Sequence, residues 1–115
     1  MRYRELVALG LAFFLTTAQT SSADAVFWQA FDLETGANGT KDIPGATRLY
    51  QQGARQGHGP FMVRLGYMKQ LGTGMPQDLR GAFALYKQSA ETGTLEGQFM
   101  YALSYEQGSA PRRTR

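Results

Sequence analysis

Apolar side chains recur at spacings of three and four along most of the chain, which is the pattern of helices that pack one face against a core. Two stripes of this kind contain nearly the same residues in the same order, Ala46, Leu49, Tyr50 and Ala54, then Ala82, Leu85, Tyr86 and Ala90. The whole pattern predicts five helices, over residues 26–35, 43–56, 60–71, 79–92 and 95–107. We therefore expect an all-α fold.

Residues that start and stop helices flank these stretches. Asp42 and Asp78 precede the second and fourth helices, where a carboxylate can accept hydrogen bonds from the free amides of the first turn. Pro44 and Pro60 lie in first turns, which tolerate proline because their amides have no partner within the helix. Glycines that stop helices stand at Gly36, Gly57, Gly72 and Gly108. These signals support the helix boundaries that the apolar pattern predicts.

The chain also repeats itself with a period of 36 residues. The segment GATRLYQQGARQG, from Gly45, aligns with GAFALYKQSAETG, from Gly81, and the same offset places Gly72 on Gly108. Eight positions are identical over this pair, where chance gives roughly two or three. Self-similarity at such a period indicates supersecondary units that stack on one another. We expect about two and a half units: a degenerate first unit at 26–56, a second at 57–92 and an incomplete third at 93–108.

Residues 1–25 have the three parts of a secretory signal peptide: a basic start, an apolar run at 6–15, and a polar stretch ending in small residues. The best cleavage site is Ala23-Asp24-Ala25, and Ser21-Ser22-Ala23 is second. Ten apolar residues rise only about 15 Å as a helix, half of the roughly 30 Å core of a bilayer. The sequence therefore predicts a periplasmic or secreted protein without a stable membrane anchor after cleavage.

Charge and composition point to no special partner. The formal net charge of +3 is accounted for by Arg112, Arg113 and Arg115, which lie in a basic tail at 109–115 that we expect to be disordered. The rest of the chain has no basic face of the kind that nucleic acid requires. The absence of cysteine excludes disulfides, thiol nucleophiles and Cys-ligated zinc. We expect stacking of the units to stabilise the small core and no nucleic acid to bind.

Candidate chemistry is sparse as well. His58 is the only histidine, and it stands at a helix entry, where a capping or solvated role is expected. The glycine-rich loops at Gly36 and Gly72 lack the preceding strand and the GK[ST] ending of a phosphate-binding loop. The carboxylates include no dense pair in an apolar setting, such as a glycosidase needs. The sequence thus predicts no catalytic, cofactor-binding or metal-binding residues, and not an enzyme.

The segment LGYMKQLGTGMPQDLRGAFALYKQSAETG resembles the Sel-1-like repeat, a relative of the tetratricopeptide repeat. The matching positions are Leu65, Gly66, Gly72, Gly74, Asp78, Ala82, Tyr86, Ala90 and Gly93. The resemblance implies an α-solenoid of antiparallel helix pairs that serves as a scaffold for protein assembly, commonly bacterial and often exported. The family has no shared catalytic constellation.

By analogy with tetratricopeptide grooves, the resemblance places partner binding on the concave face lined by the first helix of each unit. The residues expected on this face are Phe27, Phe31, Val63, Tyr67, Gln70, Phe99, Leu103 and Glu106. An alternative for several of them, the phenylalanines above all, is a place in the core. The expected partner is a protein or peptide. The alternative function is a periplasmic protein that binds peptidoglycan or a small ligand, with possible hydrolase activity of the β-lactamase-like type.

The last predicted helix is too apolar to be a terminal cap, because terminal units normally present a polar outer side. Its large apolar residues are Leu95, Phe99, Met100, Tyr101, Leu103 and Tyr105. We expect the chain to self-associate through this helix or to be marginally stable as a monomer.

Overall fold

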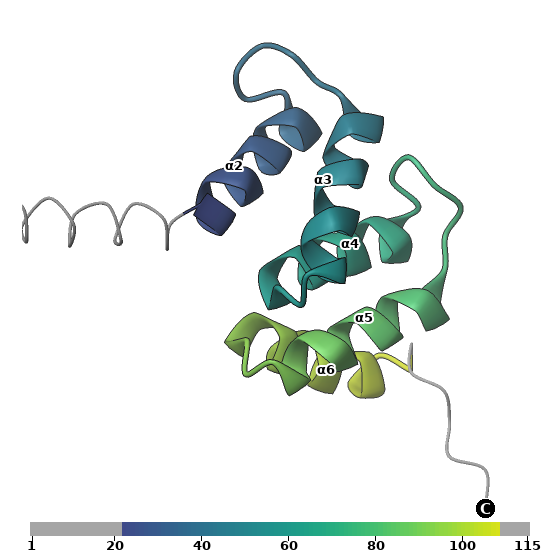
Figure 1. Ribbon diagram of the computed structural model, residues 1–115. Helices are drawn as coiled ribbons and strands as arrows, with labels where there is room; N and C mark the ends of the chain where they lie inside the picture. Colours follow the sequence, from purple (N-terminus) through teal and green to yellow (C-terminus); the bar gives the residue numbers. More distant parts are fainter. Residues whose placement is uncertain (1–21, 109–115) are drawn as a thin grey trace, which may run out of the picture.

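The computed structural model describes residues 22–108, which contain five helices joined by short loops (Figure 1). They are α2 (Ser22–Thr35), α3 (Ile43–Arg55), α4 (Gly59–Leu71), α5 (Leu79–Glu91) and α6 (Leu95–Glu106). No strand occurs in this part of the chain, so the predicted all-α fold is confirmed. Each helix packs against the next one, and α4 also packs against α6. The first 21 residues of the predicted leader and the basic tail at 109–115 lie outside the described residues.

The described part of α2 includes Ser22 to Ala25, four residues before the predicted start at Val26. The prediction began the helix where the expected leader ended. In the structure Ala23, Asp24 and Ala25 are already helical. Within residues 22–108, no helix has the combination of length and hydrophobicity that crossing a membrane requires.

The predicted aspartate caps are confirmed in both units. Asp42 Oδ1 accepts a hydrogen bond from the amide of Gly45, and Asp78 Oδ1 accepts one from the amide of Gly81, each at 2.9 Å. The αL conformation of Gly72, with φ 73°, ends α4, and this conformation favours glycine. Asp42, Asp78 and Gly72 therefore act at the helix ends where they were expected to act.

The helix α4 contributes to two buried clusters, one on each side. The first cluster lies between α2, α3 and α4 and contains Ala30, Ala46, Tyr50, Phe61, Leu65 and Met68. The second joins α4 to α5 and α6 through Val63, Ala82, Tyr86 and Met100. Gly66 permits the close crossing of α4 and α5, because a Cβ atom at this position would lie 2.6 Å from Tyr86 Cε1. This central helix thus joins the first unit to the rest of the array.

Candidate functional site

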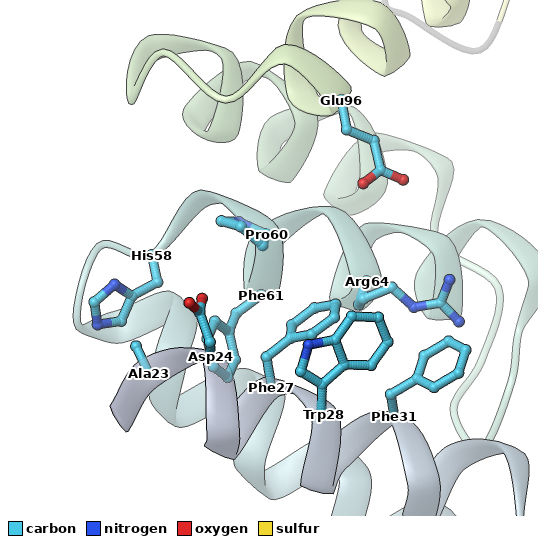
Figure 2. A pocket seen from close by; sticks show the side chains of 10 residues that line it. All are labelled: Ala23, Asp24, Phe27, Trp28, Phe31, His58, Pro60, Phe61, Arg64 and Glu96. Carbon is cyan, nitrogen blue, oxygen red and sulfur yellow. The ribbon is translucent and has the colours of Figure 1, made fainter. Parts of the chain in front are cut away.

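A groove of about 480 Å³ opens between α2, α4 and α6 (Figure 2). It is lined by Ala23, Asp24, Phe27, Trp28, Phe31, His58, Pro60, Phe61, Arg64 and Glu96. These three helices are the first helices of successive units, so the groove runs along the side of the array where the sequence placed partner binding. Its volume is within the range of ordinary ligand sites, roughly 300–1,000 Å³.

Aromatic side chains of α2 form the floor of the groove. Trp28 contacts Phe27 and Phe31 in edge-to-face geometry, with ring centroids 5.3 Å and 5.5 Å apart. Phe27 also contacts the buried Phe61 of α4, at 5.5 Å, which anchors the floor on the first core cluster. Trp28 is the outermost of these residues and is 58% exposed. The groove therefore presents an aromatic surface to solvent, packed on the core at Phe27.

Arg64 extends along one side of this floor and is held from two directions. Its Cζ atom lies 5.2 Å from the centroid of the Phe31 ring and 5.4 Å from that of Tyr67, within the range of cation–π contacts. Its guanidinium donates a hydrogen bond to the carboxylate of Glu34, with which it forms an ion pair. The positive charge of Arg64 is therefore already compensated by a group of this chain.

Tyr50 lies buried in the first core cluster, close enough to Glu34 and Arg64 to interact with both. Burial of its phenol raises the pKa of Tyr50 above the ordinary value, and the negative charge of Glu34 adds to this effect, which Arg64 partly opposes. The folded chain therefore favours the neutral phenol of Tyr50 over the phenolate.

Two further carboxylates face the groove from opposite sides. Figure 2 shows Asp24 extending from α2 at the end of the groove near His58, and Glu96 extending from α6 into the space above the aromatic residues. Both residues are exposed, and neither forms an ion pair within residues 22–108. These two groups give the groove an acidic character that the neutralised Arg64 does not offset.

The titratable side chains at the groove are few and include one histidine. No group of three or more His, Cys, Asp or Glu side chains that could hold a metal ion occurs among the described residues. His58 occupies the N-cap position of α4 without a capping hydrogen bond from its side chain, and its ring lies 5.7 Å from that of Phe61. The chemistry of the groove suits binding by aromatic contact and charge.

The structure distributes the predicted partner-binding residues over several environments. Phe27 and Phe31 line the groove. Val63 is fully buried in the second core cluster and has no surface to offer a partner, because α5 and α6 cover it. The hydroxyl of Tyr67 donates a hydrogen bond to Met100 Sδ, at 3.3 Å, and Gln70 Oε1 accepts one from the hydroxyl of Tyr86, at 2.6 Å.

The three predicted residues of α6 lie outside the groove lining. Phe99 is 63% exposed, Glu106 is exposed at the end of the helix, and Leu103 packs partly against the second core cluster. The groove thus brings together two of the eight predicted residues, and a partner role for the exposed others stays a prediction.

Sequence reasoning missed Trp28, Arg64, Asp24 and Glu96. The repeat itself contains a signal for them, because Asp24, Pro60 and Glu96 are spaced 36 residues apart. Trp28 and Arg64 are also one period apart. The repeat period therefore relates several of the groove residues to one another, although not every position at this period lines the groove.

Known proteins resemble the chain in sequence and in structure. The sequence matches the Sel1 repeat family over residues 33–58, 60–93 and 95–113. The crystal structure of a Sel1 repeat protein from Oxalobacter formigenes is similar with a TM-score of 0.69 and 26% identity, over 84% of this chain and 40% of that one. A segment of 68 residues, 59% of this chain, is 35% identical to chitin synthase regulatory factor 3 of Schizosaccharomyces pombe and covers 7% of it. The chain thus spans less than half of the length of either relative. The structural similarity confirms the predicted α-solenoid.

Proposed function

The chain belongs to the Sel1 repeat family, and on that premise we propose that it is an exported, non-catalytic adaptor whose groove between α2, α4 and α6 binds a protein partner. Sel1 repeat proteins mediate protein–protein interaction. The resemblance noted in the sequence is therefore correct at the level of family and fold. The use of this particular groove is the new element of the proposal.

The observation that carries the proposal is the exposed aromatic floor. Trp28 is a large side chain that is 58% exposed and that makes edge-to-face ring contacts with Phe27 and Phe31. Tryptophan is among the residues that contribute most to binding at protein interfaces, especially where neighbouring groups exclude water. A preformed aromatic surface also loses little conformational entropy when a partner binds.

The S. pombe relative supports a regulatory role, since it is a regulatory factor of chitin synthase. Neither relative supports the alternative of a β-lactamase-like hydrolase. We therefore assign the groove to partner binding without chemistry on the partner.

Export rests on the order of segments in residues 1–25, of which 22–25 belong to α2. Cleavage after Ala23 keeps Asp24 in the mature chain, whereas cleavage after Ala25 removes residues 22–25 from α2. Mass spectrometry of the intact protein from the cell envelope should find a mature start at Asp24 or Val26. Recovery of the full-length chain in the cytoplasm would contradict export.

Site-specific crosslinking tests the groove as the partner site. A photoreactive phenylalanine analogue at position 28 should crosslink a partner protein in cells, and one at position 71 serves as the control. Leu71 is also a large exposed residue, at 72%, but it does not line the groove. The variant Trp28→Ala should lose the partner in affinity capture, and Leu71→Ala should retain it. Equal crosslinking from both positions, or retention by both variants, would refute the proposed site.

A further inference from the structure

We propose that the groove selects a basic side chain of its partner, a lysine or arginine that lies on Trp28 with its charge beside Glu96. The inference rests on the proposed function, because it assumes that the groove is the binding surface. It adds the chemistry of the bound segment: a peptide with a cationic residue among apolar ones.

The balance of charge in the groove is the first argument. Asp24 and Glu96 face it from opposite sides, and neither has an ion-pair partner within residues 22–108 (Figure 2). Arg64 is the one lysine or arginine among the lining residues, and Glu34 compensates its charge from outside the lining. With His58 counted as neutral, both carboxylates of the full chain remain without a counterion. Cleavage after Ala23 places the new α-ammonium group on Asp24, and cleavage after Ala25 removes Asp24, so Glu96 is the carboxylate without a counterion in either mature chain. A cationic group of the partner supplies that counterion, whereas an acidic segment or a phosphate group is repelled.

The aromatic floor is the second argument. Cations bind the faces of aromatic rings, and tryptophan is the best of these partners. Arg64 already occupies such a position over Phe31 and Tyr67. No cation is found over the Trp28 ring in the described part of the chain, and this residue is the most exposed of the three floor aromatics, at 58%. The ring of Trp28 is therefore the aromatic surface of the floor that is available to a cation of the partner.

The shape of the two candidate side chains fits the same site. Lysine and arginine pack their apolar stems on hydrophobic surface while the charged end stays near polar groups. Phe27, Phe31 and Pro60 supply apolar surface, and Glu96 supplies the anion on the α6 side. An uncharged apolar side chain can pack on the aromatic floor. It would, however, remove water from the carboxylates without supplying a positive charge in its place. The combination of an aromatic floor and acidic sides thus favours a residue that is both long and positively charged.

The inference depends more on Glu96 than on Asp24. Cleavage after Ala25 removes Asp24, while Glu96 and Trp28 belong to the mature chain under either predicted cleavage. The two retained residues come from the first and third units, so the site exists only when the units are stacked.

Intrinsic fluorescence provides a direct assay, because Trp28 is the only tryptophan in the sequence. The probes are four blocked peptides, acetyl-Ala-Leu-X-Leu-Ala-amide, in which X is lysine, arginine, norleucine or glutamate. Norleucine matches the stem of lysine without its charge. The protein is produced from the full chain, and the N-terminus of the purified form is determined by mass spectrometry. At low ionic strength we expect the lysine and arginine peptides to bind about tenfold more tightly than the other two, an advantage that salt reduces.

Matched charge variants identify the carboxylate. Glu96→Gln should abolish most of the preference for lysine over norleucine, while Glu91→Gln should preserve it, because Glu91 is exposed on α5 and does not line the groove. Equal affinity for lysine and norleucine, or an unchanged preference in Glu96→Gln, would overturn the inference and leave the groove as a partner site of other chemistry. Failure of all four peptides to bind would also overturn the inference. The proposed function would then be tested separately by the crosslinking at position 28.

Discussion

The carboxylate of Glu34, near the end of α2, pairs with the guanidinium of Arg64, in the middle of α4. The two residues are 30 positions apart, and their side chains are only 14% and 24% exposed. This pair links the first unit to the second at the side of the groove that Arg64 lines. It also sets the position of Arg64 over the rings of Phe31 and Tyr67.

Breaking this pair should destabilise the fold. In Arg64→Met, the carboxylate of Glu34 stays partly buried without its cation, so we expect the free energy of unfolding to fall by about 1 to 3 kcal/mol. The double variant Arg64→Met/Glu34→Leu should recover much of that loss, because apolar pairs can replace ion pairs in such sites. Urea unfolding measures both. The control is Lys69→Met, which removes the more exposed pair with Asp78, at 3.9 Å, and should change stability by less than about 1 kcal/mol.

Gly66 should not tolerate a side chain. A methyl group at this position would lie 2.6 Å from Tyr86 Cε1, so Gly66→Ala forces α4 and α5 apart or displaces the ring. We expect a loss of about 1 to 3 kcal/mol, which is typical of overpacking. In the background Tyr86→Leu, which removes the ring, the same substitution should cost clearly less. Equal costs in the two backgrounds would show that Tyr86 is not the obstacle.

The two aspartate caps should be similar in strength, because their hydrogen bonds have the same length, 2.9 Å. Asp42→Ala and Asp78→Ala should each lower stability by about 1 kcal/mol. For a domain of this size, that loss corresponds to about 4 to 8 °C in Tm. Asparagine keeps an acceptor oxygen, so Asp42→Asn and Asp78→Asn should keep most of the stability. Thermal unfolding that does not distinguish alanine from asparagine would argue against the caps.

The buried phenols predict a loss of stability at alkaline pH. Burial is the main reason that the pKa values of Tyr50 and Tyr86 in the fold lie above the ordinary value, to which the unfolded chain returns. Ionisation therefore favours the unfolded chain, so this contribution is fully present below about pH 10 and decreases as the pH rises further, by up to about 1.4 kcal/mol per pH unit for each tyrosine. Urea unfolding at a series of alkaline pH values should reveal the decrease. Tyr50→Phe should make it shallower, and the same slope in this variant would contradict the assignment.

The outer side of α6 should mediate self-association. Leu95 is 80% exposed and Phe99 is 63% exposed, so association would bury apolar surface that the described helices leave uncovered. We expect Leu95→Glu/Phe99→Glu to weaken self-association about tenfold or more, as measured by sedimentation. Leu71→Glu alters another exposed leucine, at 72%, on α4 and should leave association unchanged. A wild-type chain that is monomeric at high concentration would refute this prediction.

Phe27, Val63 and Phe99 illustrate the limit of prediction from the repeat. They occupy the same position in successive units, 36 residues apart, and all three were predicted to contact a partner. In the structure Phe27 lines the groove, Val63 is fully buried and Phe99 is 63% exposed. The reason is that burial depends on the neighbours of each unit, and only Val63 has α5 and α6 packed over it.

The sequence by itself determined the helices, their caps and the stacking period, because these depend on residues that are close along the chain. A carboxylate three residues before a glycine amide, as in Asp42 and Asp78, acts within a single turn. The groove was decided by the tertiary structure, because it depends on how α2, α4 and α6 lie across from one another. The pair of Glu34 and Arg64 is the clearest case, since its separation of 30 residues differs from the period of 36. Such a contact follows from the angle and distance between two packed helices, which local patterns of residues do not specify.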